Sequence, residues 1–129
     1  MFRFDSFKQF RPAGHLNRLR ACLGALAGIF ITAWVSQLWL GTNEGLPTLV
    51  APMGASAVLL FAVPTSPLAQ PWSIVGGNVI SALAGITCAT FLPHTMVAAA
   101  AAVALAIGAM GLCRCIHPPG GAMALTAVI

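Results

Sequence analysis

The chain has 129 residues, of which 59% are hydrophobic and only 6% are charged. Soluble domains carry roughly 25% charged residues, whereas no Asp, Glu, Lys or Arg occurs here between Glu44 and Arg114. This composition excludes a water-soluble fold and predicts an all-α, polytopic transmembrane helical bundle.

The net charge of +4 is concentrated at the N-terminal end of the chain. Five of the six basic residues precede the first apolar run, against one acid, Asp5: Arg3, Lys8, Arg11, Arg18 and Arg20. Basic residues beside a first span stay on the cytoplasmic side, so this is a topology signal. We expect a multi-pass protein of the bacterial inner (plasma) membrane with a cytoplasmic N-terminus, and no nucleic-acid partner. A cleavable signal peptide is the alternative, but the first apolar run is about twenty residues long, too long for one.

Residues 1–20 form a basic and aromatic segment, and residues 21–129 form the transmembrane domain. Phenylalanines alternate with cations in the first segment, a pattern typical of a chain at an anionic membrane surface. A frayed cytoplasmic tail is the alternative.

Four apolar runs and a partial fifth predict the spans. The full runs are Ala21–Leu40, Pro47–Val63, Trp72–Leu92 and Thr95–Cys113. Residues 122–129 are too few to cross a bilayer, which indicates either a chain truncated at its C-terminus or a short re-entrant helix. Pro52 and Gly54 interrupt the second run, so we expect an entry segment and then a helix that begins near them; a kinked, continuous helix is the alternative. The three prolines of residues 64–71 exclude a helix there.

Two helix faces carry small residues at four-residue spacing, which lets another helix approach closely. They are Gly24, Gly28, Thr32 and Ser36 in the first span, and Gly77, Ser81 and Gly85 in the third. Asn78 is the one strongly polar side chain of the third span, and we expect it to bond either a neighbouring helix or a substrate.

The segment from His117 to Gly121 holds an imidazole, two prolines and two glycines between apolar stretches. A polar, non-helical kink at membrane depth is tolerated only where protein or a water-filled cavity satisfies its backbone. His117 has three interpretations: it donates to a substrate, it titrates and couples proton movement, or it bonds a backbone carbonyl.

Residues 52–59 resemble residues 118–125, since each begins with Pro, any residue and Gly, followed by small or apolar residues. Interrupted helices that enter from opposite sides are typical of inverted repeats around a midplane site; chance similarity in an Ala- and Gly-rich chain is the alternative. Two such helix N-termini, with Ser56 and one imidazole, would suit a small monovalent anion.

Four motifs in order carry a resemblance to a known family. They are Ala51–Phe61, Ser66–Pro71, Gly76-Gly77 and His117–Ala122, and together they resemble the HPP family of integral membrane proteins. The resemblance implies a small helical membrane domain, and some members are associated with nitrite transport. This chain departs from the family pattern in two places: Asn78 stands where we expect a histidine, and the last span of the pattern is missing.

Cys113, Cys115 and His117 alternate along the chain and would suit a soft metal, but they lack the paired spacing of a zinc site. We expect no metal and no cofactor. The sequence has no Ser/His/Asp set, carboxylate pair or phosphate loop, so we expect no enzyme.

The sequence therefore predicts a transporter or channel for a small monovalent anion, with nitrite as the leading candidate, that works in the lipid bilayer as a homo-oligomer. A non-transporting membrane module that assembles with or regulates a partner is the main alternative, and a metal-responsive protein is a further one. The candidate pathway residues are Pro52, Gly54, Ser56, Ser66, Gln70, Gly76, Gly77, Asn78, His117, Pro118, Pro119, Gly120 and Gly121.

Overall fold

The computed structural model describes residues 14–40 and 50–129, and within these ranges all regular elements are helices. The elements are α1 (His15–Leu40), α2 (Ala51–Ala62), the 3₁₀ turn η2 (Pro67–Ala69), α3 (Pro71–Phe91), α4 (Thr95–Leu112) and α5 (Pro119–Thr126). The helices α1, α3 and α4 are long and apolar enough to cross a membrane. The all-α, membrane-spanning prediction is confirmed.

The predicted third and fourth spans agree with α3 and α4 to within a residue at each end. The first helix starts earlier than expected, at His15, so the predicted boundary at residue 20 falls within its first two turns. Arg18 and Arg20 are therefore helical. Their long apolar stems can lie along the helix while the charged ends reach the membrane surface.

The second predicted span is a half-length helix. α2 has 12 residues, which extend for about 18 Å, short of the roughly 30 Å of a bilayer core. It begins at Ala51 with Pro52 in its first turn, which confirms the expected helix start near Pro52. Pro64 and Pro67 follow its end and prevent its continuation. The first residues of the predicted run, 47–49, lie outside the described residues.

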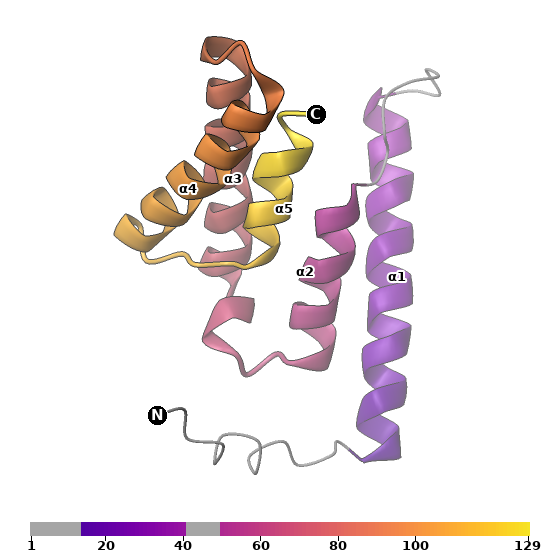
Figure 1. Cartoon of the computed structure of the whole chain (residues 1–129). Helices are drawn as coiled ribbons and strands as arrows, with labels where there is room; N and C mark the ends of the chain where they lie inside the picture. Colours follow the sequence, from indigo (N-terminus) through magenta and orange to yellow (C-terminus); the bar gives the residue numbers. More distant parts are fainter. Residues whose placement is uncertain (1–13, 41–49) are drawn as a thin grey trace, which may run out of the picture.

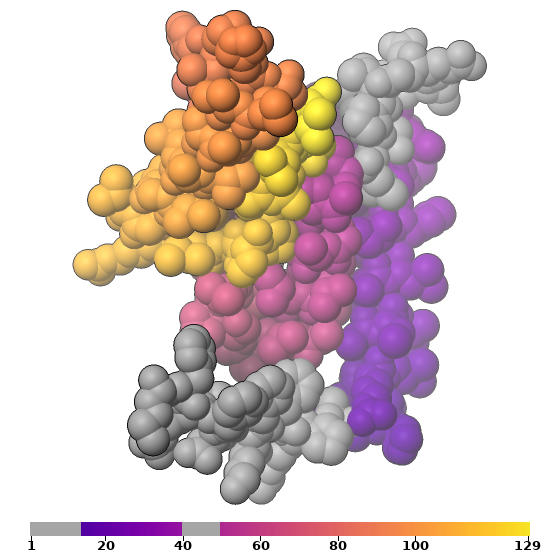
Figure 2. Space-filling model, viewed as in Figure 1, coloured from indigo at the N-terminus to yellow at the C-terminus, as the bar shows by residue number. Residues whose placement is uncertain are grey.

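Figure 1 shows α2, α3, α4 and α5 gathered together, with α1 along one side against α2. The two short helices α2 and α5 contact each other and run in opposite directions (Figure 1). The space-filling view shows α5 flanked by α4 and α2, with α1 at the edge (Figure 2). The opposite directions agree with the predicted entry of two interrupted helices from opposite sides.

Small side chains let α3, α4 and α5 approach closely. The buried core consists of Ala84, Cys88, Ala98, Ala102, Ala106, Met110, Cys115 and Ala124. A Cβ atom on Gly85 of α3 would collide with the backbone oxygen of Ala124 and with the methyl group of Ala127 in the α5 region. This confirms the predicted close-packing face of the third span.

The face of small residues on α1 serves the same purpose toward α2. Cβ atoms on Gly24 and Gly28 would lie 2.6 Å and 3.0 Å from atoms of the Phe61 ring. The two glycines therefore form the surface on which the ring of Phe61 rests. The predicted packing role of this face is confirmed.

A tight turn ends α4 and sends the chain toward α3. Arg114 has a φ of 53°, and its N–H donates to the Gly111 carbonyl at 3.2 Å while that of Cys115 donates to the Met110 carbonyl at 2.9 Å. This pair of bonds is the Schellman motif, in which glycine usually takes the place of Arg114. The indole N–H of Trp72 on α3 donates to the carbonyl of Cys113 at 3.1 Å and ties the turn to α3. The next residues, 115–118, lead into α5.

Candidate functional site

The imidazole of His117 is fully buried, with 0% of the residue exposed, and both of its ring nitrogens have partners. Nδ1 lies 2.8 Å from the carbonyl oxygen of Leu68, and Nε2 lies 2.8 Å from Oγ of Ser56. A carbonyl only accepts hydrogen bonds, so Nδ1 carries a hydrogen and donates it. In the neutral ring Nε2 is then the acceptor, and the Ser56 hydroxyl donates to it.

Glycine at position 77 is what allows His117 to reach this place. A Cβ atom on Gly77 would lie 2.6 Å from the Cβ of His117 and 2.8 Å from the Cys115 carbonyl oxygen. The packing continues one turn along α3, where Ser81 is fully buried and its Oγ would lie 2.5 Å from a Cβ on Gly120. The ring is thus fixed by backbone packing as well as by hydrogen bonds.

Asn78 extends the hydrogen-bond network to α3. Its Nδ2 donates to the Ile74 carbonyl at 2.9 Å and lies 3.5 Å from the Ser56 Oγ. Its Oδ1 is buried and has no hydrogen-bond partner in the part of the chain that the structure describes. A single chain of polar contacts therefore runs from Asn78 through Ser56 and His117 to Leu68.

A cavity of about 250 Å³ lies beside this network, among α1, α2, α3 and α5. Thr32, Ser56 and Asn78 are the polar side chains that line it. The rest of its wall is apolar and includes Met53 and Met123. No charged residue is among the described residues that form this wall.

The helix ends differ from our expectation. Pro118 and Pro119 have no N–H, while the N–H of Gly120 donates to the His117 carbonyl at 2.8 Å and that of Gly121 to the Pro118 carbonyl at 3.1 Å. The first turn of α5 therefore satisfies its own donors through i→i+3 bonds. We expected this end to offer free N–H groups to an anion, and that expectation was wrong because the turn closes on itself.

The start of α2 is similar. Pro52 is buried and has no N–H, and the N–H of Met53 already donates to the Val50 carbonyl at 2.9 Å. Side chains, and not the two helix ends, therefore supply the polar groups at the cavity.

The other predicted residues lie around the network without lining the cavity. The Oγ of Ser66 accepts from the N–H of Leu68, and Nε2 of Gln70 donates to the Ser66 carbonyl. These two residues shape the turn that presents the Leu68 carbonyl. A Cβ atom added to Gly76 would lie 3.3 Å from the Cβ of Cys115, so this glycine is closely packed. A Cβ atom added to Gly54 or Gly121 would have nothing within 4 Å.

The cysteine pair does not join His117 in a common site. Cys113 is exposed, Cys115 is buried, and both nitrogens of His117 already have partners. Cys115 packs instead against Gly76 and Gly77 of α3. No group of three His, Cys, Asp or Glu side chains in residues 14–40 and 50–129 is placed to hold a metal ion.

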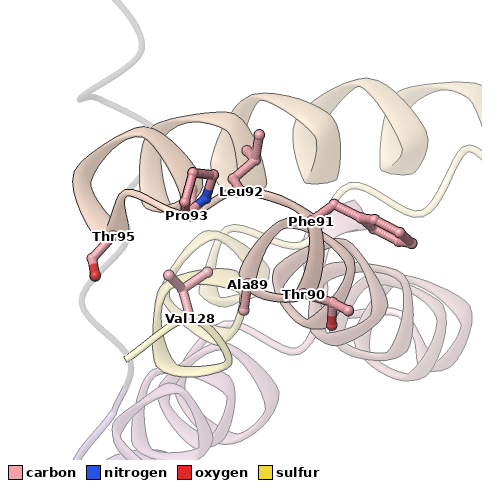
Figure 3. A pocket seen from close by; sticks show the side chains of 8 residues that line it. Ala89, Thr90, Phe91, Leu92, Pro93, Thr95 and Val128 are labelled. Carbon is pink, nitrogen blue, oxygen red and sulfur yellow. The ribbon is translucent and has the colours of Figure 1, made fainter.

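A second cavity, of about 330 Å³, lies at the α3–α4 turn. Figure 3 shows its lining, in which Leu92 and Pro93 come from the turn and Val128 from the end of the chain. The hydroxyl of Thr90 there donates to its own helix, at the Ile86 carbonyl. None of the residues predicted from the sequence lies in this cavity.

Sequence reasoning missed two parts of the site. The carbonyl of Leu68 leaves no signal in the sequence, because every residue has one. Thr32 was assigned to a packing face, but it also lines the cavity, and its position on the face of small residues toward α2 could have indicated this.

Half-length helices, buried polar contacts and apolar outer faces define a polytopic helical membrane protein with a polar centre. The chain belongs to the HPP family: the family model described as HPP, transmembrane region, matches residues 11–129.

Two curated relatives from Dictyostelium discoideum, both named only as transmembrane proteins, match the chain. One is 47% identical over 140 residues, which cover 100% of this chain and 45% of the relative. The other is 42% identical over 111 residues, which cover 83% of this chain and 39% of the relative. The chain thus spans less than half the length of these relatives. No solved structure matches it.

Proposed function

We propose that the protein is a transporter or channel for a small monovalent anion, with nitrite as the leading candidate. The observation that carries this proposal is the cavity beside Ser56 and Asn78, with the imidazole of His117 bonded behind Ser56. Polar groups buried among membrane helices usually mark a substrate or ion pathway.

The size and polarity of the cavity favour a small ligand of low charge. Its volume of about 250 Å³ exceeds the roughly 30 Å³ that one water occupies in the liquid, so a triatomic anion with a few waters fits. The described residues of its wall include three polar side chains and no charged one. A buried charge without a partner costs several kcal/mol, and this cost rises with the charge of the ion, so the wall disfavours a divalent anion more than a monovalent one.

We propose a non-enzymatic role, although Ser56 and His117 form a contact like that of a nucleophile and its base. The group that orients the ring is the Leu68 carbonyl. The described ranges contain no Asp or Glu that could stabilise an imidazolium, because the only acids of the chain are Asp5 and Glu44.

We further propose that the protein acts as a homo-oligomer in a bacterial inner membrane, with its N-terminus in the cytoplasm. The described residues include three helices long enough to cross a membrane. Three such helices enclose little space by themselves, and a second copy would close the pathway. Arg18 and Arg20 at the start of α1 support the orientation. Cross-linking of the reconstituted protein tests the oligomer.

Uptake of nitrite into proteoliposomes tests the proposed function. The wild type, His117→Ala and Ser56→Ala are compared, with Thr87→Ala as the matched control because the Thr87 hydroxyl is exposed and bonds its own helix. We expect uptake by the wild type and the control, and a loss in the two site variants. Wild-type uptake no faster than that of empty vesicles would contradict the proposal and leave the non-transporting membrane module as the function.

A further inference from the structure

The hydrogens of the polar side chains at the cavity are all committed elsewhere. One hydrogen of Asn78 Nδ2 is donated to the Ile74 carbonyl, and the other is directed at the Ser56 Oγ, 3.5 Å away. The hydroxyl of Thr32 donates to the Gly28 carbonyl at 2.8 Å. With His117 neutral, the hydroxyl hydrogen of Ser56 is directed at Nε2. In this state the hydroxyl oxygens of Ser56 and Thr32 offer lone pairs to the cavity and no free hydrogen, and such a surface repels an anion.

A proton on His117 reverses this arrangement. Nδ1 keeps its bond to the Leu68 carbonyl, so an added proton can only take Nε2. Nε2–H then donates to the Oγ of Ser56, whose own hydrogen is released and can turn to the cavity. The change makes one N–H bond. Toward His117, Ser56 changes from a donor to an acceptor, and its hydroxyl hydrogen becomes available to a ligand in the cavity.

We infer that a proton carried by His117 is the co-substrate of the anion, and that the two enter the site together. This inference rests on the proposed function. In this proposal the Ser56–His117 hydrogen bond couples the protonation of the fully buried ring to the binding of the ligand in the cavity.

The charges around the ring support this pairing. His117 is contacted by Ser56 of α2, Leu68 of η2 and Gly77 of α3. Asn78 in turn contacts Ser56, and none of these four residues titrates. In the segment between α4 and α5, which carries His117 itself, Cys115 is buried and Arg114 is exposed. A buried charge without a partner costs several kcal/mol, so imidazolium or anion alone binds poorly, whereas each compensates the other.

Two consequences follow from this compensation. Binding of the proton and of the anion must strengthen each other by the same factor, since coupling between sites is reciprocal. Movement of the pair carries no net charge, so uptake should follow the pH gradient and ignore the membrane potential.

The test measures initial nitrite uptake into proteoliposomes under an imposed pH gradient or a potassium–valinomycin potential. The rate in protein-free vesicles, which reports diffusion of nitrous acid through lipid, is subtracted. We expect the protein-dependent rate to rise by up to about tenfold per unit of external acidification, because one proton binds. An inside-positive potential should leave that rate unchanged, and one proton should disappear from the outside with each nitrite.

The variant His117→Gln separates the imidazole's charge from its hydrogen bonds, because its amide can donate to the Leu68 carbonyl and accept from Ser56 but cannot hold the proton. We expect it to keep the melting temperature of the wild type and to lose the pH-driven uptake. Wild-type uptake that follows the potential and not the pH gradient would overturn the inference and leave the proposed function standing. Wild-type uptake no faster than in protein-free vesicles would overturn both.

Discussion

Ser56 and His117 lie 61 positions apart in the chain, and their side chains are joined by a hydrogen bond of 2.8 Å. Ser56 belongs to residues 52–59 and His117 immediately precedes residues 118–125, the two stretches whose sequences resemble each other. The bond therefore connects α2 to the segment that leads into α5, the short helix that runs in the opposite direction. It is also the only direct link between the buried imidazole and a side chain that lines the cavity, within the described ranges.

Replacement of Ser56 by Ala should destabilise the protein more than the loss of an ordinary hydroxyl. It leaves Nε2 of His117 fully buried without a partner, and an unsatisfied buried group costs about 1–3 kcal/mol. Thermal unfolding in detergent micelles, followed by circular dichroism, measures the difference.

The control for this variant is Thr87→Val, which removes an exposed hydroxyl that bonds the Leu83 carbonyl of its own helix. We expect it to change the melting temperature little. Equal losses in both variants would show that the Ser56–His117 bond has no special weight in the fold.

Gly77→Ala should disrupt the position of His117. Its Cβ would lie 2.6 Å from the Cβ of His117 and 2.8 Å from a backbone oxygen, and neither atom is the far end of a flexible side chain. Overpacking of this kind costs about 1–3 kcal/mol. Gly108→Ala in α4 is the matched control, since nothing lies within 4 Å of its added Cβ and Ala favours a helix by up to about 1 kcal/mol. The melting temperatures of the two variants in detergent micelles should therefore change in opposite directions. A Gly77→Ala variant more stable than the wild type would contradict the close contact between Gly77 and His117.

The helices and their small-residue faces could be predicted from local pattern. Apolar runs give α1, α3 and α4, and four-residue spacing of small side chains gives the contacts made by Gly28 and Gly85. The length of α2 was harder to predict, because hydropathy does not distinguish a half-length helix from a kinked span. Pro52 was the residue that indicated where α2 begins.

The residues of the candidate site could be predicted from the sequence, but the hydrogen bonds between them could not. Ser56, Asn78 and His117 each stood out as a polar side chain in an apolar stretch. Their common network depends on tertiary contacts, above all on the Leu68 carbonyl that reaches Nδ1. A local feature explains why the prediction of free N–H groups at the helix ends is wrong. The first turn of α5 bonds its own N–H groups, which the sequence does not reveal.

The packing of α1 against α2 should depend on a matched pair, Gly24 and Phe61. A Cβ on Gly24 would lie 2.6 Å from the Phe61 ring, so Gly24→Ala should destabilise the protein by pushing the ring away. Phe61→Leu shortens the side chain and loses ring contacts, yet it makes room for that methyl group.

We expect the double variant Gly24→Ala/Phe61→Leu to be more stable than the sum of the two single changes allows, with a coupling of about 0.5–3 kcal/mol. Urea- or SDS-induced unfolding of the four proteins in micelles measures this coupling. Gly14→Ala serves as the control partner, since nothing lies within 4 Å of its added Cβ, and its combination with Phe61→Leu should be additive. An additive Gly24 cycle would rule out the direct contact.

Arg114→Gly should stabilise the protein. Arg114 holds a φ of 53° at the end of α4, a conformation that costs an L-residue other than glycine roughly 1–2 kcal/mol, and the Schellman bonds that require it use only the backbone. Glycine keeps these bonds and removes the strain, although its greater freedom in the unfolded chain offsets part of the gain. Arg114→Ala removes the same charge but retains the strain, so it isolates the effect of the backbone. We expect the melting temperature in micelles to rank Arg114→Gly above Arg114→Ala, and the reverse order would mean that the side chain of Arg114, and not its backbone, determines the stability of this turn.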